Sequence, residues 1–408
     1  MATRVSRTST LGSLTTWTWS GWVKRGKVSS GSHTLFASIT DANNYTQCYI
    51  DSGDDFRFLN YVSSSTTGAL TTDRKFRDPG AWYHIVVNWD SSNASAGDRI
   101  RLYVNGVEET SFSTDTQPGS SDPSDMNKSG AVTSMGGHTL ASEDFYGELS
   151  HCHFIDGTIY GPTTFGETDS TSGIWKIKTS PSVTYGTNGW FLKFEDRTNL
   201  DLDSGTNAFT FTTTGTLTAT YDNPSNNFCT LNPLDGNIIN SGGLLNGNTN
   251  YNKTSTGSGY NTTCLSTLGV SAGKWYWECK ATDVATADCV LGFMSTAHGP
   301  YDAHYQLFNL STTPNSYGYR NNGTKYVGDA QTTSFFNTFV DGDIISFAMD
   351  LDNGKCYAAK NGTWENSGDP TSGATGTGSF ADITDLTQFY VPAVSNYNYT
   401  DATKVDFN

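Results

Sequence analysis

Strict alternation of apolar and polar residues in two neighbouring segments constrains this chain more than any other feature. In the first segment, residues 82–89, one face carries Tyr83, Ile85, Val87 and Trp89. In the second segment, residues 99–104, one face carries Ile100, Leu102 and Val104. A period of two is what a half-buried antiparallel strand requires, and Asn105-Gly106 then supplies the positive φ angles of a tight turn. The same pattern recurs along the chain and predicts an all-β protein.

The composition also favours sheets and turns over helices. Aromatic residues make up 13% of the chain, charged residues only 16%, and there are 42 glycines. Aromatic side chains suit a pleated surface, and glycine suits tight turns. A chain of 408 residues is too long for one compact core. The breaker cluster Asp222-Asn223-Pro224-Ser225-Asn226 places a boundary near residue 225, which predicts one domain at 1–225 and a second at 226–408.

Each predicted domain contains several strand candidates. In the first domain they are residues 11–25, 33–39, 46–50, 56–59, 146–155 and 188–194, with 209–212 and 217–221 as short ones. Trp17 and Trp19 are expected to share a buried face. In the second domain they include 274–280 and two strands joined by Asn353-Gly354. Trp275, Trp277 and Cys279 are expected to point inward.

The net charge of −16 and the pI of about 4.7 exclude several partners. A nucleic-acid binder needs a basic surface, and so does a protein that adheres to an anionic membrane. There is no run of 18 apolar residues, so no membrane insertion is expected. The seven cysteines form no CxxC motif, and the first ten residues lack an apolar signal region. Synthesis in a reducing cytosol is therefore expected.

Three N-terminal segments carry a family resemblance. They are WTWSGWVKR at 17–25, FRDPGAWYHIVV at 76–87 and RLYVNGVE at 101–108. They resemble the laminin-G-like branch of the concanavalin-A-like lectin/glucanase fold. Two later segments, 154–178 and 185–196, are similar to structural proteins of tailed bacteriophages, particularly marine ones.

The C-terminal part resembles a different family. GKWYWE at 273–278, SYGYRNNGTKY at 316–326, DGDIISFAMDLDNGK at 341–355 and KNGTW at 360–364 are similar to a SPRY domain. Together the resemblances imply two antiparallel β-sandwich (jelly-roll) domains, concanavalin-A-like and then SPRY-like.

The phage resemblance implies a virion surface protein rather than an enzyme. Such a head or tail fibre, or adhesin, would assemble with other virion proteins and attach to a host-surface polysaccharide. Homo-oligomers, often trimers, are implied, although no coiled-coil heptads are visible. One alternative is a structural capsid-decoration protein without a ligand. The other is a polysaccharide depolymerase.

Catalytic patterns are hard to find in this sequence. A retaining glucanase of the resembling fold carries Glu-x-Asp-x-Glu on one strand, and this chain lacks that pattern. The nearest acidic groups are Glu143-Asp144 with Glu148, and Glu195-Asp196. His151 and His153 would share a strand face, but no third metal ligand is identifiable, so an outward-facing strand edge is the alternative.

Two sets of residues are the candidate binding sites. Calcium is the one cofactor that the laminin-G resemblance leaves open, and the acids in rim-like loops are Asp54, Asp55, Asp122 and Asp125. Solvated acids of turns are the alternative for all four. For a glycan, the candidate ligand residues are Tyr301, Tyr305 and Trp364. The alternative is that these rings pack against their own loops or against a neighbouring subunit.

Overall fold

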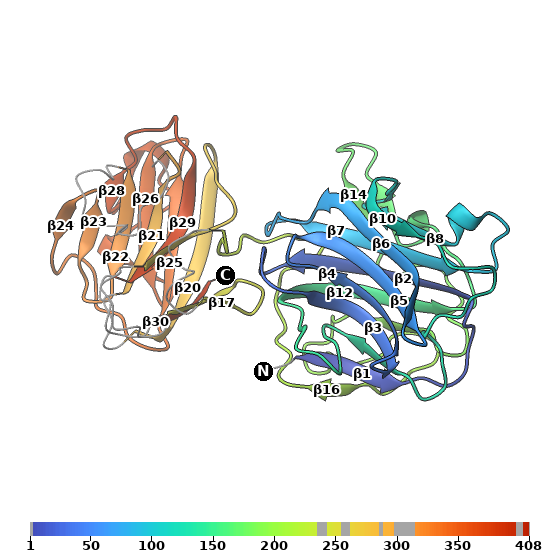
Figure 1. The fold of residues 1–408 in the computed structure, drawn as a ribbon. Helices are drawn as coiled ribbons and strands as arrows, with labels where there is room; N and C mark the ends of the chain where they lie inside the picture. Colours follow the sequence, from blue (N-terminus) through green and yellow to red (C-terminus); the bar gives the residue numbers. More distant parts are fainter. Residues whose placement is uncertain are drawn as a thin grey trace. The chain divides into compact units, whose positions relative to one another are not determined.

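The computed structural model describes residues 3–234, 243–253, 262–284, 289–297, 315–396 and 403–407. The chain divides into two compact units, Met1–Asn227 and Phe228–Asn408. Both are built from antiparallel strands, so the all-β expectation is confirmed (Figure 1). The helices of the described part are four short 3-10 turns: η1 (Ala96–Asp98), η2 (Pro162–Thr164), η3 (Glu365–Ser367) and η4 (Gly373–Thr375). Among the described residues, none of the helices has the length and apolar character needed to cross a bilayer.

The first unit consists of two sheets and a small hairpin. The larger sheet has the order β10 (Phe112–Thr116), β6 (Ser65–Lys75), β5 (Asp55–Val62), β4 (Asn44–Ile50), β3 (His33–Asp41), β11 (Val132–Met135), β1 (Arg4–Thr8) and β16 (Thr212–Thr214). The smaller sheet has the order β15 (Trp190–Leu192), β12 (Gly147–Asp156), β2 (Thr16–Arg25), β7 (Trp82–Asp90), β8 (Ile100–Val104) and β9 (Val107–Glu108). The hairpin pairs β13 (Gly166–Thr168) with β14 (Trp175–Ile177).

One apolar core lies between these two sheets. Trp17 and Trp19 on β2 are fully buried in it, which confirms that they share the inner face. Trp89 on β7 stacks on Trp17 with ring centroids 6.3 Å apart. Phe36 of the larger sheet stacks on Trp19 in the same way at 5.6 Å. Aromatic side chains from both sheets therefore hold the sandwich together.

The outer face of the smaller sheet is buried as well. Strand β7 was expected to be half-buried, but His84 and Val86 on its outer face have no exposed surface. The chain after β12 folds back over this face, so Phe165 packs against Val86 and Trp175 packs against Trp22. The sequence pattern of β7 alone could not show this, because the covering segment lies about 80 residues further along the chain.

The second unit is also a two-sheet sandwich. The first sheet has the order β17 (Leu244–Leu245), β18 (Asn250–Lys253), β30 (Thr403–Phe407), β20 (Lys274–Asp283), β25 (Ile344–Asp350), β26 (Lys355–Lys360) and β27 (Thr363–Trp364), and β28 (Ala381–Asp382) also pairs with β26. The second sheet has the order β19 (Thr262–Leu265), β29 (Tyr390–Asn396), β21 (Cys289–Ser295), β22 (Ser316–Arg320), β23 (Lys325–Val327) and β24 (Ala330–Thr332).

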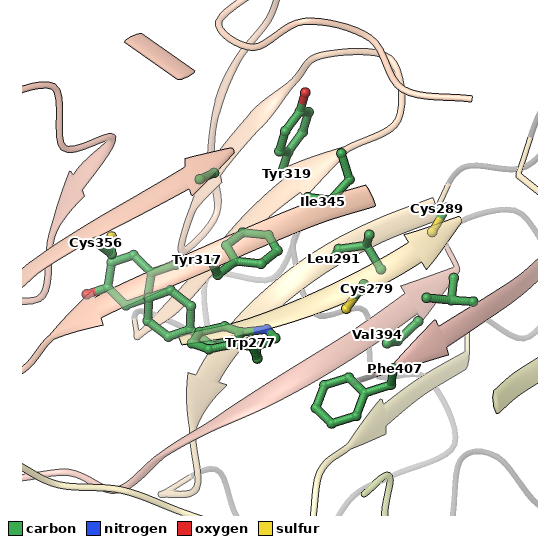
Figure 2. Packing of buried hydrophobic residues seen from close by; sticks show 14 of the residues in the cluster. Trp277, Cys279, Cys289, Leu291, Tyr317, Tyr319, Ile345, Cys356, Val394 and Phe407 are labelled. Atoms are coloured by element: carbon green, nitrogen blue, oxygen red, sulfur yellow. The ribbon is translucent and has the colours of Figure 1, made fainter. Parts of the chain in front are cut away.

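The core of this unit gathers side chains from both of its sheets (Figure 2). Trp277 and Cys279 of β20 point into it as expected, and Trp277 stacks on Phe347 with ring centroids 5.4 Å apart. The expectation for Trp275 is wrong, because this side chain is 46% exposed. It lies at the start of β20, where its indole N–H donates to the carbonyl of Ala272 at 2.7 Å.

Three strand expectations also need correction. The sequence analysis did not predict strands β1 and β6. For β6 the reason is that the segment is rich in Ser and Thr and contains Gly68. The candidate at 209–212 is shifted, since the strand observed there is β16. The candidate at 217–221 is not a strand.

Candidate functional site

Two tyrosines lie side by side on the outer face of the larger sheet of the first unit. Tyr45 on β4 and Tyr61 on β5 are directly opposite residues of the ladder. Their ring centroids are 5.2 Å apart and the ring planes are tilted by 36°. Both side chains are half-buried, so part of each ring faces solvent. His138, from the loop that follows β11, packs edge-on against Tyr45 at 5.7 Å.

A hydrogen-bonded polar group lies next to this ring pair. Gln47 follows Tyr45 by two residues and therefore shares its face of the sheet. Its side-chain N–H2 group donates to the hydroxyl of Thr34 and to a carboxylate oxygen of Glu143, both at 2.6 Å. Thr34 also donates to the same carboxylate oxygen at 3.3 Å. Because each partner orients the next, the polar group is preorganised.

The same alternation places a third tyrosine and a cation on this face. Tyr49 lies opposite Arg57 in the ladder, and the guanidinium of Arg57 is 5.6 Å from the centre of the Tyr49 ring. The Arg57 side chain remains 41% exposed. Burial raises the pKa of Tyr45 and of Tyr49, so both phenols stay protonated at neutral pH. We call this surface the tyrosine face; its residues are Tyr45, Gln47, Tyr49, Arg57, Tyr61, His138 and Glu143.

Asp54, one of the four expected calcium ligands, is fully buried in an ion network. Its carboxylate accepts hydrogen bonds from Arg25 and Arg77 at 2.8 Å each, and from the N–H of Ser29 at 2.7 Å. Burial alone would raise the pKa of Asp54, but these hydrogen bonds outweigh it and lower the pKa. The neighbouring Asp55 points elsewhere and binds Lys75 at 2.6 Å.

The other two expected calcium ligands are also occupied by local partners. The carboxylate of Asp122 accepts the N–H of Gly119 at 2.7 Å. Asp125 is buried and accepts the N–H of Thr40 at 2.9 Å, with Lys128 at 3.4 Å. Among the residues that the structure describes, no three His, Cys, Asp or Glu side chains gather where they could hold a metal ion. Calcium binding at these four positions stays a prediction without a ligand cluster behind it.

The three expected glycan ligands have different outcomes. Tyr301 and Tyr305 lie outside the described residues. Trp364 forms part of β27 and is half-buried. Its ring lies 6.4 Å from that of Tyr276, a residue of β20 that the sequence analysis did not single out.

A serine–histidine pair is buried under the β13–β14 hairpin. Nε2 of His84 is 2.9 Å from the Ser20 hydroxyl, which is the geometry of a nucleophile and its base. The indole N–H of Trp175, however, donates to Nδ1 of His84 at 3.0 Å. Because indole nitrogen only donates, the imidazole proton must be on Nε2, and His84 donates to Ser20 rather than activating it. Burial lowers the pKa of His84 to about 3, so the ring is neutral.

His151 and His153 were expected at an outward-facing strand edge, and this expectation is wrong. Their strand, β12, lies between β15 and β2, and both side chains are buried. His153 stacks on Phe191 at 3.8 Å and bonds to the Tyr185 hydroxyl at 3.0 Å. His151 lies at a bulge and pairs with Glu195 at 3.2 Å. The pair is therefore a packing element of the sheet.

The sequence contained a signal for the tyrosine face that the analysis did not use. In the segment 44–50, Tyr45, Gln47 and Tyr49 alternate with Thr46 and Cys48, so one face is aromatic and polar and the other is small. A strand that carries large polar and aromatic side chains on its outer face is a candidate binding surface. His138 and Glu143 come from a loop that is distant in the sequence, and no local sequence pattern predicts that they lie on this face.

Comparison with known proteins agrees with this architecture for the first unit. Residues 3–159 match the family model of the concanavalin A-like lectin/glucanases superfamily. This segment includes the whole tyrosine face, and the expected concanavalin-A-like character is confirmed for it. No curated protein matches the chain.

Solved structures similar to this chain include two SPRY domains and a pentraxin. The SPRY domain of human HERC1 is 18% identical, with a TM-score of 0.31, over 43% of this chain and 96% of that one. A further human SPRY domain is 18% identical, with a TM-score of 0.30, over 40% of this chain and 93% of that one. The heptameric SAP-like pentraxin from Limulus polyphemus is 17% identical, with a TM-score of 0.28, over 39% and 72%.

Proposed function

We propose that this chain is a non-enzymatic virion surface protein, a phage head or tail fibre or adhesin, that attaches to host-surface glycan through the tyrosine face. The observation that carries the glycan part is the Tyr45–Tyr61 ring pair beside the Gln47–Glu143 hydrogen bonds. A sugar presents an apolar C–H face to a ring and hydroxyl groups to polar neighbours. Aromatic rings with a few fixed polar groups are the usual lining of such a site.

The phage part of the proposal rests on the sequence resemblance at 154–178 and 185–196. In the structure, Phe165, Trp175 and Tyr185 of these segments pack over the outer face of the smaller sheet, and Trp190–Leu192 forms its edge strand β15. The outer face of the larger sheet carries the half-buried rings of Tyr45 and Tyr61. Display of many copies on a particle would multiply weak contacts into firm attachment.

A binding role without catalysis is supported by how the acidic side chains are used. A glycosidase needs two carboxyl groups on opposite sides of the bond that is broken. On the tyrosine face, Glu143 is engaged by Gln47 and Thr34. Glu148 is buried near Lys24 and Asp222, and Glu195 pairs with His151. A depolymerase would release reducing ends from host polysaccharide, so this activity is assayed at high protein concentration as part of the test.

The proposal is tested with the full chain on immobilised host-surface polysaccharide. We expect Tyr61→Ala to weaken binding about 5- to 30-fold, since one buried aromatic contact contributes about 1–2 kcal/mol. Tyr221→Ala is the matched control, because Tyr221 is 65% exposed and lies outside the tyrosine face. Equal binding by wild type and Tyr61→Ala would overturn the proposal. Particle stability that depends on the protein, with no glycan binding at all, would favour the decoration protein instead.

The virion location has its own test. We expect mass spectrometry of purified, nuclease-treated particles to contain the chain in stoichiometric amounts, and antibodies against it to label intact particles. A chain found only in the lysate and never on particles would refute this part.

A further inference from the structure

A second aromatic surface lies on the second unit, on the outer face of the sheet that contains β20. Outer-face side chains form two rows across the ladder. One row is Tyr276, Ala348 and Tyr357, and the other is Glu278, Ser346, Ala359 and Trp364. The middle of both rows consists of small side chains.

The rings of Tyr276 and Trp364 approach each other above the small side chains in the middle of the two rows. Strands β20 and β27 are three strand spacings apart, which is about 14 Å. The ring centroids of Tyr276 and Trp364 are nevertheless only 6.4 Å apart, with the planes at 70°. Both side chains must therefore lean inward across β25 and β26. Ala348 and Ala359 permit this, because a larger side chain at either position would occupy the space of the rings.

Neighbouring side chains fix the position of Trp364. Its ring also lies 6.4 Å from Tyr357, at 79°, and the Tyr357 hydroxyl bonds to Ser372 at 3.2 Å. The next residue, Glu365, is buried, and its carboxylate accepts hydrogen bonds from the side-chain amide of Asn337 at 3.0 and 3.2 Å. The indole orientation is thus fixed before any ligand arrives, which reduces the entropy cost of binding.

Tyr276 is the exposed member of the pair. Its side chain is 57% exposed, although large apolar rings are normally covered. The phenol donates a hydrogen bond to Glu278, whose carboxylate also accepts from Ser346 at 3.4 Å. The surface therefore combines an exposed ring, an oriented indole and a carboxylate acceptor at one place.

The charges around the rings indicate which ligand fits. Lys274 binds Asp350 at 3.0 Å and Lys360 binds Asp343 at 3.0 Å, so these cations at the borders of the surface are already paired. Glu278 adds a negative charge, and the whole chain carries −16. An acidic polysaccharide would be repelled from such a surface. A neutral sugar has no such penalty and offers both a C–H face and hydroxyl groups.

We propose that the Tyr276–Trp364 surface is a second binding site, which takes neutral pyranose residues of a glycan chain. The C–H face of one sugar ring stacks on the exposed ring of Tyr276, and the edge of the same sugar contacts the indole of Trp364, whose plane is at 70° to the phenol. Its hydroxyl groups donate hydrogen bonds to the Glu278 carboxylate. This inference extends the proposed glycan attachment to the second unit and does not depend on the tyrosine face.

The test measures binding of the full chain to neutral glucans and mannans and to an acidic polysaccharide. We expect Trp364→Ala and Tyr276→Ala each to lower the affinity for the neutral glycan by about tenfold, which corresponds to about 1.4 kcal/mol for the loss of one contact ring. Trp364→Phe keeps a ring and should retain most of the binding. Trp275→Ala is the matched control, because Trp275 is 46% exposed but lies on the other face of β20.

The outcomes separate this inference from the proposed function. If Tyr61→Ala abolishes binding and the Trp364 and Tyr276 variants bind like wild type, this inference is overturned and the proposed function stands. If the reverse holds, the second site is supported and the tyrosine face is refuted. If the Trp364 and Tyr276 variants change the oligomeric state in sedimentation but no sugar affinity, the surface contacts a second copy of the chain and this inference is overturned. Stronger binding of the acidic polysaccharide would also overturn it.

Discussion

Asp54 is an example of a side chain whose role is decided by partners distant in the sequence. As a loop acid beside Asp55 it fits a calcium ligand, but Arg25 and Arg77 neutralise it inside the first unit. Only the fold brings these three residues together. We conclude that the acid pattern of a loop predicts charge but not the identity of the cation that meets it.

This network gives a prediction about stability. Asp54→Asn leaves the buried Arg25 guanidinium without its counter-charge, so we expect a loss of about 3–5 kcal/mol in the free energy of unfolding. Asp55→Asn is the control, since the Lys75 side chain of that pair is 43% exposed and such pairs contribute less than about 1 kcal/mol. Urea titrations followed by tryptophan fluorescence measure both. Equal, small losses would contradict the structural role of Asp54.

Glu148 gives a prediction about pH. Burial, and then the nearby Asp222, raise the pKa of Glu148 to about 8 against the opposing effect of Lys24. Its pKa in the unfolded chain is near 4.5. Between these values the folded state keeps a proton that the unfolded state has lost. The contribution of Glu148 to stability is therefore complete below pH 4.5 and is lost as the pH rises to 8. The slope reaches at most about 1.4 kcal/mol per pH unit.

The variant Glu148→Gln isolates this contribution. Glutamine has a similar shape and cannot titrate, so its unfolding free energy should lose the decline between pH 6.5 and 8. Buried histidines act in the opposite sense at lower pH, since burial lowers the pKa of His33 and of His151 to about 4. Histidines of the unfolded chain titrate near pH 6.5 and affect wild type and variant alike, so the Glu148 contribution is the difference between their two profiles in urea unfolding at pH 6.5, 7.25 and 8.0. Parallel pH profiles of wild type and variant would contradict the raised pKa.

At the scale of elements, hairpins were the most predictable part of the fold. Asn105-Gly106 joins β8 to β9 with both residues at positive φ, and Gly354, also at positive φ, completes the turn between β25 and β26. The layer over the smaller sheet was not predictable. The contacts of Trp175 with Trp22 and His84 depend on long-range packing, and the sequence around Trp175 has no regular period.

The predictable turn at Gly106 lies against Trp175 of the covering β13–β14 hairpin. Its φ is +83°, and a Cβ atom there would lie 2.5 Å from the Trp175 ring. Gly106→Ala should therefore strain the turn and displace the β13–β14 hairpin. Gly130 has a φ of +85° with nothing within 4 Å of the added atom, so Gly130→Ala measures the strain of the turn alone. We expect Gly106→Ala to cost about 1–3 kcal/mol more than this control in urea unfolding. Equal costs would show that the hairpin does not press on the turn.

At the scale of the whole molecule, the all-β class followed from composition and alternation, whereas the two proposed ligand surfaces did not. Both surfaces consist of outer-face residues, such as Tyr61 and Tyr276, whose exposure depends on what the rest of the chain leaves uncovered. The sequence shows which residues share a face of a strand. It does not show whether a later segment covers that face, as Trp175 covers His84 and no described segment covers Tyr276.

The two units have separate cores, one around Trp17 and Trp89 and the other around Trp277 and Phe347. A unit with its own core can unfold cooperatively by itself, so we expect two transitions in differential scanning calorimetry of the full chain. The Asp54→Asn variant should lower the midpoint of one transition by about 5 °C or more and leave the other within 1 °C, because its network lies wholly in the first unit. Trp277→Phe should do the opposite, since this indole is buried in the second core. A single transition that both variants shift equally would mean that the units fold as one cooperative body, and the contributions of their two surfaces to binding would then be coupled rather than additive.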